Sequence, residues 1–142
     1  MEPVELKLGG FSLLVYGRES PDSDDYWDGN WLLVRARVEA HRAFVEAEGS
    51  FLHAPELANF MKELEVLHAT LVGEAVLRCM EPNLEIAIES KSLGHMEVRV
   101  MLTPDNMTQS HNFTFDLDQS YLGPVLDGCR RVLLRWPIRA NT

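Results

Sequence analysis

The sequence lacks the segments that direct a protein to or across a membrane. Its first five residues contain neither the basic nor the apolar part of a signal peptide, and no apolar run reaches the roughly 20 residues that a membrane helix needs. We therefore expect a cytoplasmic protein without a membrane partner. Cysteine is scarce too: Cys79 and Cys129 lie 50 residues apart and form no metal-binding motif, so we expect two buried free thiols.

Basic residues are in the minority. Thirteen lysines and arginines stand against 22 aspartates and glutamates, which gives a formal net charge of −9 at pH 7. Such a charge repels the phosphates of nucleic acids and the anionic surface of membranes, and it attracts basic proteins. The composition therefore argues against a nucleic-acid partner and favours a basic protein partner.

The motifs of the common catalytic sites are missing as well. The five histidines include no two at metal-ligand spacing on one helix, and the serines lie in no nucleophile elbow. No lysine follows the glycine pair Gly9-Gly10, as a phosphate-binding loop would require. We therefore expect no cofactor, no metal site and no enzymatic activity.

The composition of the chain is that of a globular protein. Hydrophobic residues make up 46% and charged residues 25% of the sequence, and no segment is of low complexity. A chain of 142 residues can bury one good hydrophobic core. Residues 1–142 are thus expected to form one globular domain, and either a monomer or a homodimer is compatible with the sequence.

Alternation of apolar and polar residues predicts that much of the chain is β-strand. The clearest strand, residues 31–40, is followed by a second at 43–52, and the two are expected to form a hairpin. The expected cross-strand partners are Arg35 and Arg37 on the first strand, and Glu46 and Glu48 on the second. The other predicted strands cover residues 4–8, 11–16, 74–79, 83–89, 94–103 and 111–118.

Apolar residues at spacings of three and four predict two helices, at residues 55–71 and 122–136. His68 falls in the apolar stripe of the first helix, where we expect a hydrogen-bonded core histidine. The predicted fold class is α+β: about eight antiparallel strands with two helices packed on the sheet, in the order four strands, helix, four strands, helix.

The segment from residue 17 to residue 31 is the most unusual part of the chain. It holds five carboxylates and three aromatic rings within 15 residues, and Arg18 is its only basic residue. So many acids are too costly to bury, so we expect an exposed loop. An EF-hand calcium site does not fit, because counting from Asp24 places Tyr26 at the third ligand position and Arg35 at the twelfth.

Two interpretations of this acidic loop remain open at the level of sequence. In one, it is a surface that binds a partner; in the other, an aspartate caps a turn and Trp27 closes the end of the sheet. Trp31 lies next to a strand and is expected in the core or in support of the loop. The candidate partner-binding residues are Asp22, Asp24, Asp25, Tyr26, Trp27 and Asp28.

Motifs along almost the whole chain resemble those of one family, the WapI-type immunity proteins of bacterial contact-dependent and polymorphic toxin systems. The most specific motif is Asp25-Tyr26-Trp27-Asp28-Gly29-Asn30-Trp31-Leu32, which follows a Gly-Arg-Glu-x-Pro motif. The weaker ones are Gly73-Glu74-Ala75, Gly94-His95-x-Glu97 and the run from Phe113 to Leu122. The resemblance implies a small, acidic, cytoplasmic and non-catalytic protein that binds a toxin domain and neutralises it.

The resemblance also implies a mechanism. If the toxin is a nuclease, its active cleft must be basic, and the acidic loop could occupy that cleft as a charge mimic. In this hypothesis Tyr26 and Trp27 anchor the complex, because aromatic rings dominate interface hot spots, and the aspartates of the loop steer the toxin. The alternatives are another small protein-binding or regulatory module and, less favoured, a hydrolase that uses His95 with a nearby carboxylate.

Overall fold

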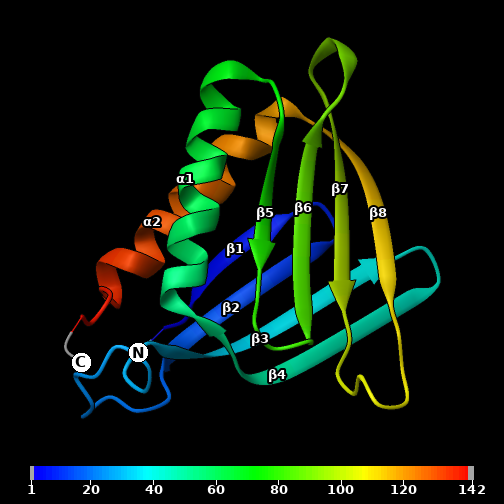
Figure 1. The fold of residues 1–142 in the computed structure, drawn as a ribbon. Coiled ribbons are helices and arrows are strands. Elements are labelled where there is room, and N and C mark those ends of the chain that lie inside the picture. The colour runs from blue at the N-terminus through cyan, green and yellow to red at the C-terminus, as the bar shows by residue number, and fades with distance from the viewer. Residues whose placement is uncertain (1, 141–142) are drawn as a thin grey trace.

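The computed structural model describes residues 2–140, and in it the strands form two separate four-stranded antiparallel sheets (Figure 1). The first sheet contains β1 (Val4–Leu8), β2 (Phe11–Arg18), β3 (Trp31–Ala40) and β4 (Ala43–His53) in that order. The second contains β5 (Glu74–Arg78), β6 (Leu84–Ser90), β7 (His95–Leu102) and β8 (Asn112–Asp118). The helices are α1 (Ala54–Thr70) and α2 (Leu122–Arg135), with short 3₁₀ turns at Ser92–Gly94 and Gln119–Tyr121.

The predicted α+β class and the predicted order of elements are confirmed. The expected domain at 1–142 includes residues 1, 141 and 142, which lie outside the described residues. The predicted β3–β4 hairpin is confirmed together with its ion pairs. Arg35 lies 3.2 Å from Glu48, and Arg37 lies 2.6 Å from Glu46. Because both pairs are exposed to solvent, they contribute little to stability.

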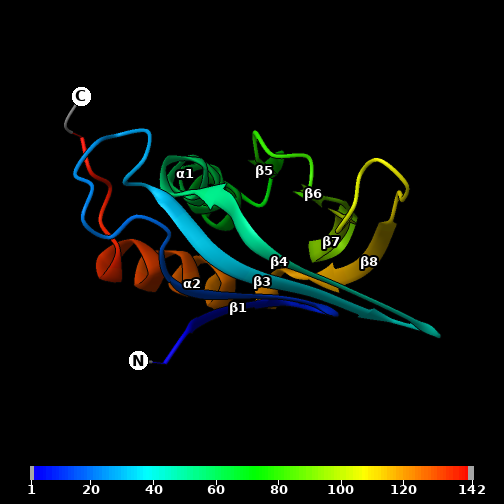
Figure 2. The ribbon, with the colours of Figure 1, turned by 90° about the horizontal axis from the view of Figure 1, so that it is seen from below.

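Each helix packs beside the first strand of the other half of the chain. The helix α1 follows β4 but lies beside β5, and α2 follows β8 but lies beside β1 and against α1. Figure 2 shows both helices on one side of the molecule, where the two sheets spread apart. Among residues 2–140, no helix is long and apolar enough to cross a membrane.

Side chains of the two helices bind the backbone of the two strands that they cover. On α1, the carboxylate of Glu63 accepts a hydrogen bond of 2.9 Å from the backbone N–H of Val76 in β5. On α2, the guanidinium of Arg131 donates one of 3.1 Å to the backbone carbonyl of Glu5 in β1. The helices therefore close the edges β1 and β5, whose backbone groups have no neighbouring strand on that side.

The hydrophobic core is built from both sheets and both helices. The helices contribute the buried side chains Leu57, Phe60, Leu64 and Leu67 from α1, and Leu122, Val125, Leu126, Cys129 and Val132 from α2. The predicted core position of His68 is wrong: this side chain is exposed. The buried stripe passes through Leu64 and Leu67, and His68, one residue further around the helix, falls beyond its rim.

Both cysteines are free, as expected, with Cys129 buried and Cys79 partly buried. Burial raises the pKa of both thiols, and that of Cys129 reaches about 12. Neither thiol therefore has the low pKa that a reactive or metal-binding thiolate needs.

The turn between β1 and β2 contacts the second sheet at the end of the core. A Cβ atom on Gly10 would lie 2.2 Å from the backbone carbonyl of Glu39 and 2.9 Å from the Phe115 ring of β8. The carbonyl of Gly10 also accepts a hydrogen bond of 2.8 Å from the N–H of Glu39. Only glycine allows this approach, so the turn and the two sheets are packed without room for a methyl group.

We expect Gly10→Ala to lower the free energy of unfolding by about 2–4 kcal/mol, because the new methyl group overlaps a backbone oxygen. The matched control is Gly17→Ala in β2, where nothing lies within 4 Å of the added Cβ, and it should change that free energy by less than about 0.5 kcal/mol. Urea unfolding followed by circular dichroism measures both. Equal stability of the two variants would contradict the packing described for the turn.

Candidate functional site

In the structure, residues 17, 18 and 31 belong to strands, so the acidic loop is residues 19–30; it connects β2 to β3 and lies beside the C-terminal end of the described chain (Figure 1). Its two ends meet: the N–H of Glu19 donates a hydrogen bond of 2.9 Å to the carbonyl of Trp31. The loop therefore extends from the same end of the first sheet at which β4 finishes and α1 begins.

The carboxylate of Asp25 shapes the tip of the acidic loop. It accepts hydrogen bonds of 2.9 Å from the backbone N–H groups of both Trp27 and Asp28, and the carbonyl of Asp25 accepts one of 2.8 Å from Gly29. A Cβ on Gly29 would lie 2.5 Å from the carbonyl of Ser23, so a side chain there would disrupt the turn. Asp25 thus caps a turn, as the structural interpretation of the loop anticipated.

The side chain of Asn30 joins the acidic loop to the C-terminal segment. Asn30 is completely buried, and its amide donates hydrogen bonds of 2.7 Å to the carbonyl of Tyr26 and 2.8 Å to that of Arg139. Its oxygen accepts one of 2.9 Å from the N–H of Arg139. Because a buried amide must be fully hydrogen-bonded to be stable, Asn30 holds these two segments in one arrangement.

Two arginines reinforce this junction. Arg18 donates a hydrogen bond of 2.7 Å to the carbonyl of Gly29 and another to the carbonyl of Pro137. The guanidinium of Arg139, in the C-terminal segment, donates a hydrogen bond to the carbonyl of Ser23 in the loop. Desolvation and, secondly, the positive charge of Arg139 lower the pKa of Arg18 from its ordinary value. The two arginines therefore bind backbone carbonyls of the loop and of the C-terminal segment.

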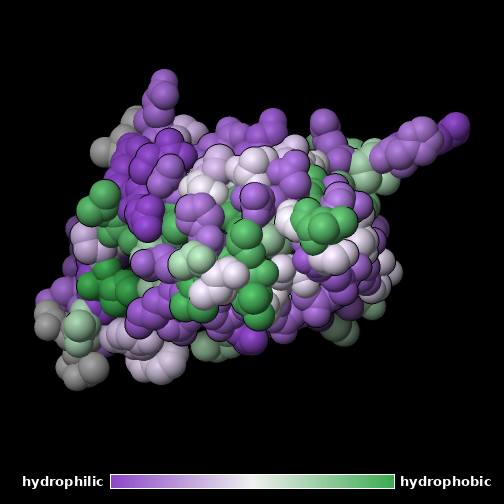
Figure 3. All heavy atoms as spheres, turned by 90° about the horizontal axis from the view of Figure 1, so that it is seen from above, coloured by the Kyte–Doolittle hydropathy of each residue, from purple (hydrophilic) through white to green (hydrophobic). Residues whose placement is uncertain are grey.

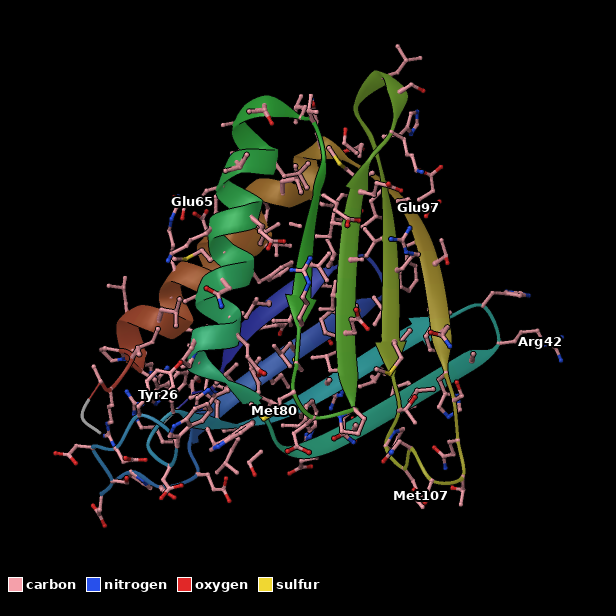
Figure 4. All side chains as sticks on the ribbon, viewed as in Figure 1. Tyr26, Arg42, Glu65, Met80, Glu97 and Met107 are labelled. Atoms are coloured by element: carbon pink, nitrogen blue, oxygen red, sulfur yellow. The ribbon has the colours of Figure 1, made fainter. Side chains whose placement is uncertain are left out.

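The ring of His53, at the end of β4, packs against the aromatic residues of the loop. Its ring is almost completely buried, with Nε2 lying 3.2 Å from the carbonyl oxygens of both Tyr26 and Trp27. The Trp27 ring stacks on it with 5.7 Å between centroids and 12° between planes, and Trp31 packs on it at 4.6 Å. Figure 4 shows Tyr26 beneath the N-terminal end of α1. Trp31 therefore supports the loop, in agreement with the sequence-based expectation.

The structure divides the candidate residues into two groups. Asp25 and Tyr26 are partly buried and serve the loop itself, whereas Asp22, Asp24 and Asp28 are exposed. Trp27 is 56% exposed although its ring rests on His53. The loop thus presents one indole ring among three carboxylates on a fixed backbone.

Three residues of this site, His53, Asn30 and Arg139, were not predicted from the sequence. His53 lies opposite Trp31 in the register of β3 and β4, so extending the second predicted strand, 43–52, by one residue would have found it. The contact between Asn30 and Arg139 spans 109 residues and left no local signal.

The residues of the hydrolase alternative lie close together on the second sheet without a hydrogen bond between them. The Nδ1 atom of His95 lies 3.7 Å from the Asp116 carboxylate, beyond hydrogen-bond distance, and both side chains are mostly exposed. Within residues 2–140, no three histidine, cysteine, aspartate or glutamate side chains are grouped as a metal site would require.

We expect Asp25→Ala to lower the free energy of unfolding by about 1–2 kcal/mol, because two backbone N–H groups lose their acceptor. The neighbouring exposed carboxylate provides the control: Asp28→Ala should change this free energy by less than about 0.5 kcal/mol. Chemical denaturation at neutral pH measures both. A silent Asp25→Ala variant would show that the turn does not depend on this carboxylate.

Comparison with known proteins agrees with the motifs noted in the sequence. A search of curated proteins found no match. The family model described as the immunity protein WapI-like family matches residues 6–137, which include both helices, the acidic loop and both sheets except the first two residues of β1. The match extends over far more than half of the 142 residues. The chain belongs to the WapI-like immunity protein family.

Proposed function

We propose that this chain is a non-catalytic, cytoplasmic immunity protein that binds and neutralises a cognate bacterial toxin domain with a basic surface, such as a nuclease. Membership of the family supports an immunity role and a protein partner. The observation that carries the proposal is the exposed Trp27 ring, stacked on His53 in a loop whose Asp22, Asp24 and Asp28 are also exposed.

The charge of the protein suits a basic target. The chain carries a net charge of −9, and Asp22, Asp24 and Asp28 are exposed on the acidic loop. Such carboxylates raise the rate of association with a basic surface, and their effect weakens as salt screens the charges. In this proposal the three aspartates steer the toxin toward the loop.

The Trp27 ring supplies the anchor. Tryptophan is among the side chains most often found at interface hot spots, because a large ring buries much apolar area at low entropic cost. Its position on His53 and the hydrogen bonds of Asp25 and Asn30 fix the loop before binding. A fixed loop loses little conformational entropy when it binds, which favours affinity.

Asp25 and Tyr26 have a supporting part in the proposed interface. Asp25 holds the turn that presents Trp27, and the Tyr26 ring meets Trp27 edge-on with 5.1 Å between centroids. The two interpretations of the loop are therefore combined in one site: some of its residues build the turn, and others face the partner.

Co-expression tests the function directly. The toxin domain encoded next to this gene should kill cells when expressed alone and should be tolerated when this chain is produced with it, because the two form a complex. Colony counts and co-purification from the surviving cells provide the readout. Death of cells that contain the folded, soluble chain would contradict the proposed immunity function.

Binding kinetics test the acidic loop. We expect Trp27→Ala to weaken toxin binding by about 30-fold or more, mainly through faster dissociation. The matched control is Leu134→Ala, which removes an exposed apolar side chain from α2 and should leave affinity within about twofold.

The exposed acids should act on the association rate. Replacing Asp22 and Asp28 together by asparagine should lower that rate and reduce its dependence on salt, because fewer charges steer the toxin. Surface plasmon resonance at several salt concentrations measures both constants. Wild-type kinetics in all loop variants would place the interface elsewhere on the chain.

A further inference from the structure

Two of the four edge strands have no element covering them. Helices cover β1 and β5, whereas β4 and β8 end their sheets without a neighbour among residues 2–140. Figure 1 shows β8 as the outermost strand of the second sheet, with the end of the β3–β4 hairpin of the first sheet reaching past its lower part. Uncovered strand edges are the sites at which a strand of another chain can add to a sheet.

The backbone of β8 points half of its hydrogen-bonding groups outward. The N–H of Leu102 donates a hydrogen bond to the carbonyl of His111, so this pair is a hydrogen-bonded pair of the antiparallel ladder. Because such pairs alternate along the ladder, residues 113, 115 and 117 bond to β7. The N–H and C=O groups of Asn112, Thr114, Asp116 and Asp118 therefore face away from the sheet.

The inner face of β8 is incompletely covered. Its inward side chains, Phe113, Phe115 and Leu117, pack against the core but stay partly exposed. On the other free edge, β4, the inward side chains are buried. An added strand would thus bury new apolar surface on the core face beside β8 and little on the core face beside β4, where the exposed Phe44 lies on the opposite face.

The two free edges also differ in regularity. The β7–β8 ladder runs in unbroken register from residue 112 to residue 118. The β3–β4 ladder contains a register shift next to Gly49. Irregularities of this kind protect an edge against pairing with another chain, and β8 has none.

The outer face of β8 is acidic. Asp116 is 81% exposed, Asp118 lies two residues further on, and Glu97 of β7 stands opposite Asp116 in the register. Figure 4 shows Glu97 on the strand next to β8. The basic side chains of β7 are His95, whose Nδ1 lies 3.7 Å from the Asp116 carboxylate, and Arg99, which pairs with Glu74, Glu89 and Glu97. A strand beside β8 would therefore meet an excess of negative charge.

We propose that β8 accepts a β-strand from a basic protein partner, with lysine or arginine on one face of that strand and apolar residues on the other. Side chains opposite Thr114 and Asp116 would lie on the acidic face, and those opposite Phe113 and Phe115 would cover the inner face. Identifying this partner with the toxin rests on the function proposed above.

Other occupants and surfaces fit less well. A second copy of this chain, paired through β8, would bring two acidic strands together, which is unfavourable. Figure 3 shows the face at the C-terminal end of α1, where hydrophobic side chains lie in separate patches among hydrophilic ones. Such separate patches do not form one continuous apolar surface for a partner.

A synthetic strand tests the proposal without the toxin, so this result and that of the co-expression experiment are independent. The probe is a blocked heptapeptide that alternates lysine and valine, and the matched peptide has glutamate in place of lysine. Both are titrated into the ¹⁵N-labelled full-length chain. The lysine peptide should slow amide exchange of Thr114 and Asp116 by at least about fivefold and leave Phe44 of β4 unchanged, whereas the glutamate peptide should have no effect.

Variants separate strand addition from simple charge attraction. Thr114→Pro removes an outward N–H of β8 and should weaken binding of the lysine peptide by at least about tenfold, while Phe44→Pro on β4 should change it by less than about twofold. If the proline variant fails to fold, Asp116→Lys provides a second variant. It should bind the glutamate peptide more tightly than the lysine peptide, the reverse of the wild-type preference. Equal binding of both peptides, protection on β4, or a dimer that protects Thr114 without peptide would each overturn the proposal.

Discussion

The fold depends on one constraint: the edges of its two small sheets carry unpaired backbone groups that must be covered or left open to solvent. Four strands are too few for either sheet to close on itself, so each has two edges with unpaired backbone groups. The helices cover one edge of each sheet, and each does so in the half of the chain to which it does not belong. Glu63 and Arg131 complete this cover by bonding to β5 and β1. The two halves are interlocked as a result and share one core.

This arrangement also places the acidic loop. The strand β4 must end where α1 begins, and His53 stands at that junction. Its N–H donates a hydrogen bond of 2.9 Å to Glu56 in the first turn of α1, while its ring carries Trp27. On the other side, Asn30 binds the segment that follows α2. The loop is therefore bound at the start of α1 and at the segment after α2, and these contacts fix the backbone that carries its exposed acids.

Much of the fold followed from local patterns. Alternation located the strands, and spacings of three and four located both helices to within one residue at each end. The β3–β4 pairing was predictable because a short turn leaves one register that keeps its apolar side chains on the core face. His68 was misplaced because helical spacing alone does not show where the rim of a buried stripe lies. The sequence showed that the loop is rich in aspartates and aromatic rings. It did not show which of these side chains stabilise the turn and which are exposed to solvent.

The sequence by itself determined the elements, their order, the acidic charge and the motifs of the family, because these depend on residues close together in the chain. The tertiary structure decided which strands share a sheet, which edges the helices cover and which carboxylates face solvent. Its deciding contacts join distant residues, such as Arg131 with Glu5 across 126 positions and Arg139 with Asn30 across 109. Backbone periodicity carries no information over such separations, since only packing of the whole chain brings these groups within hydrogen-bond distance.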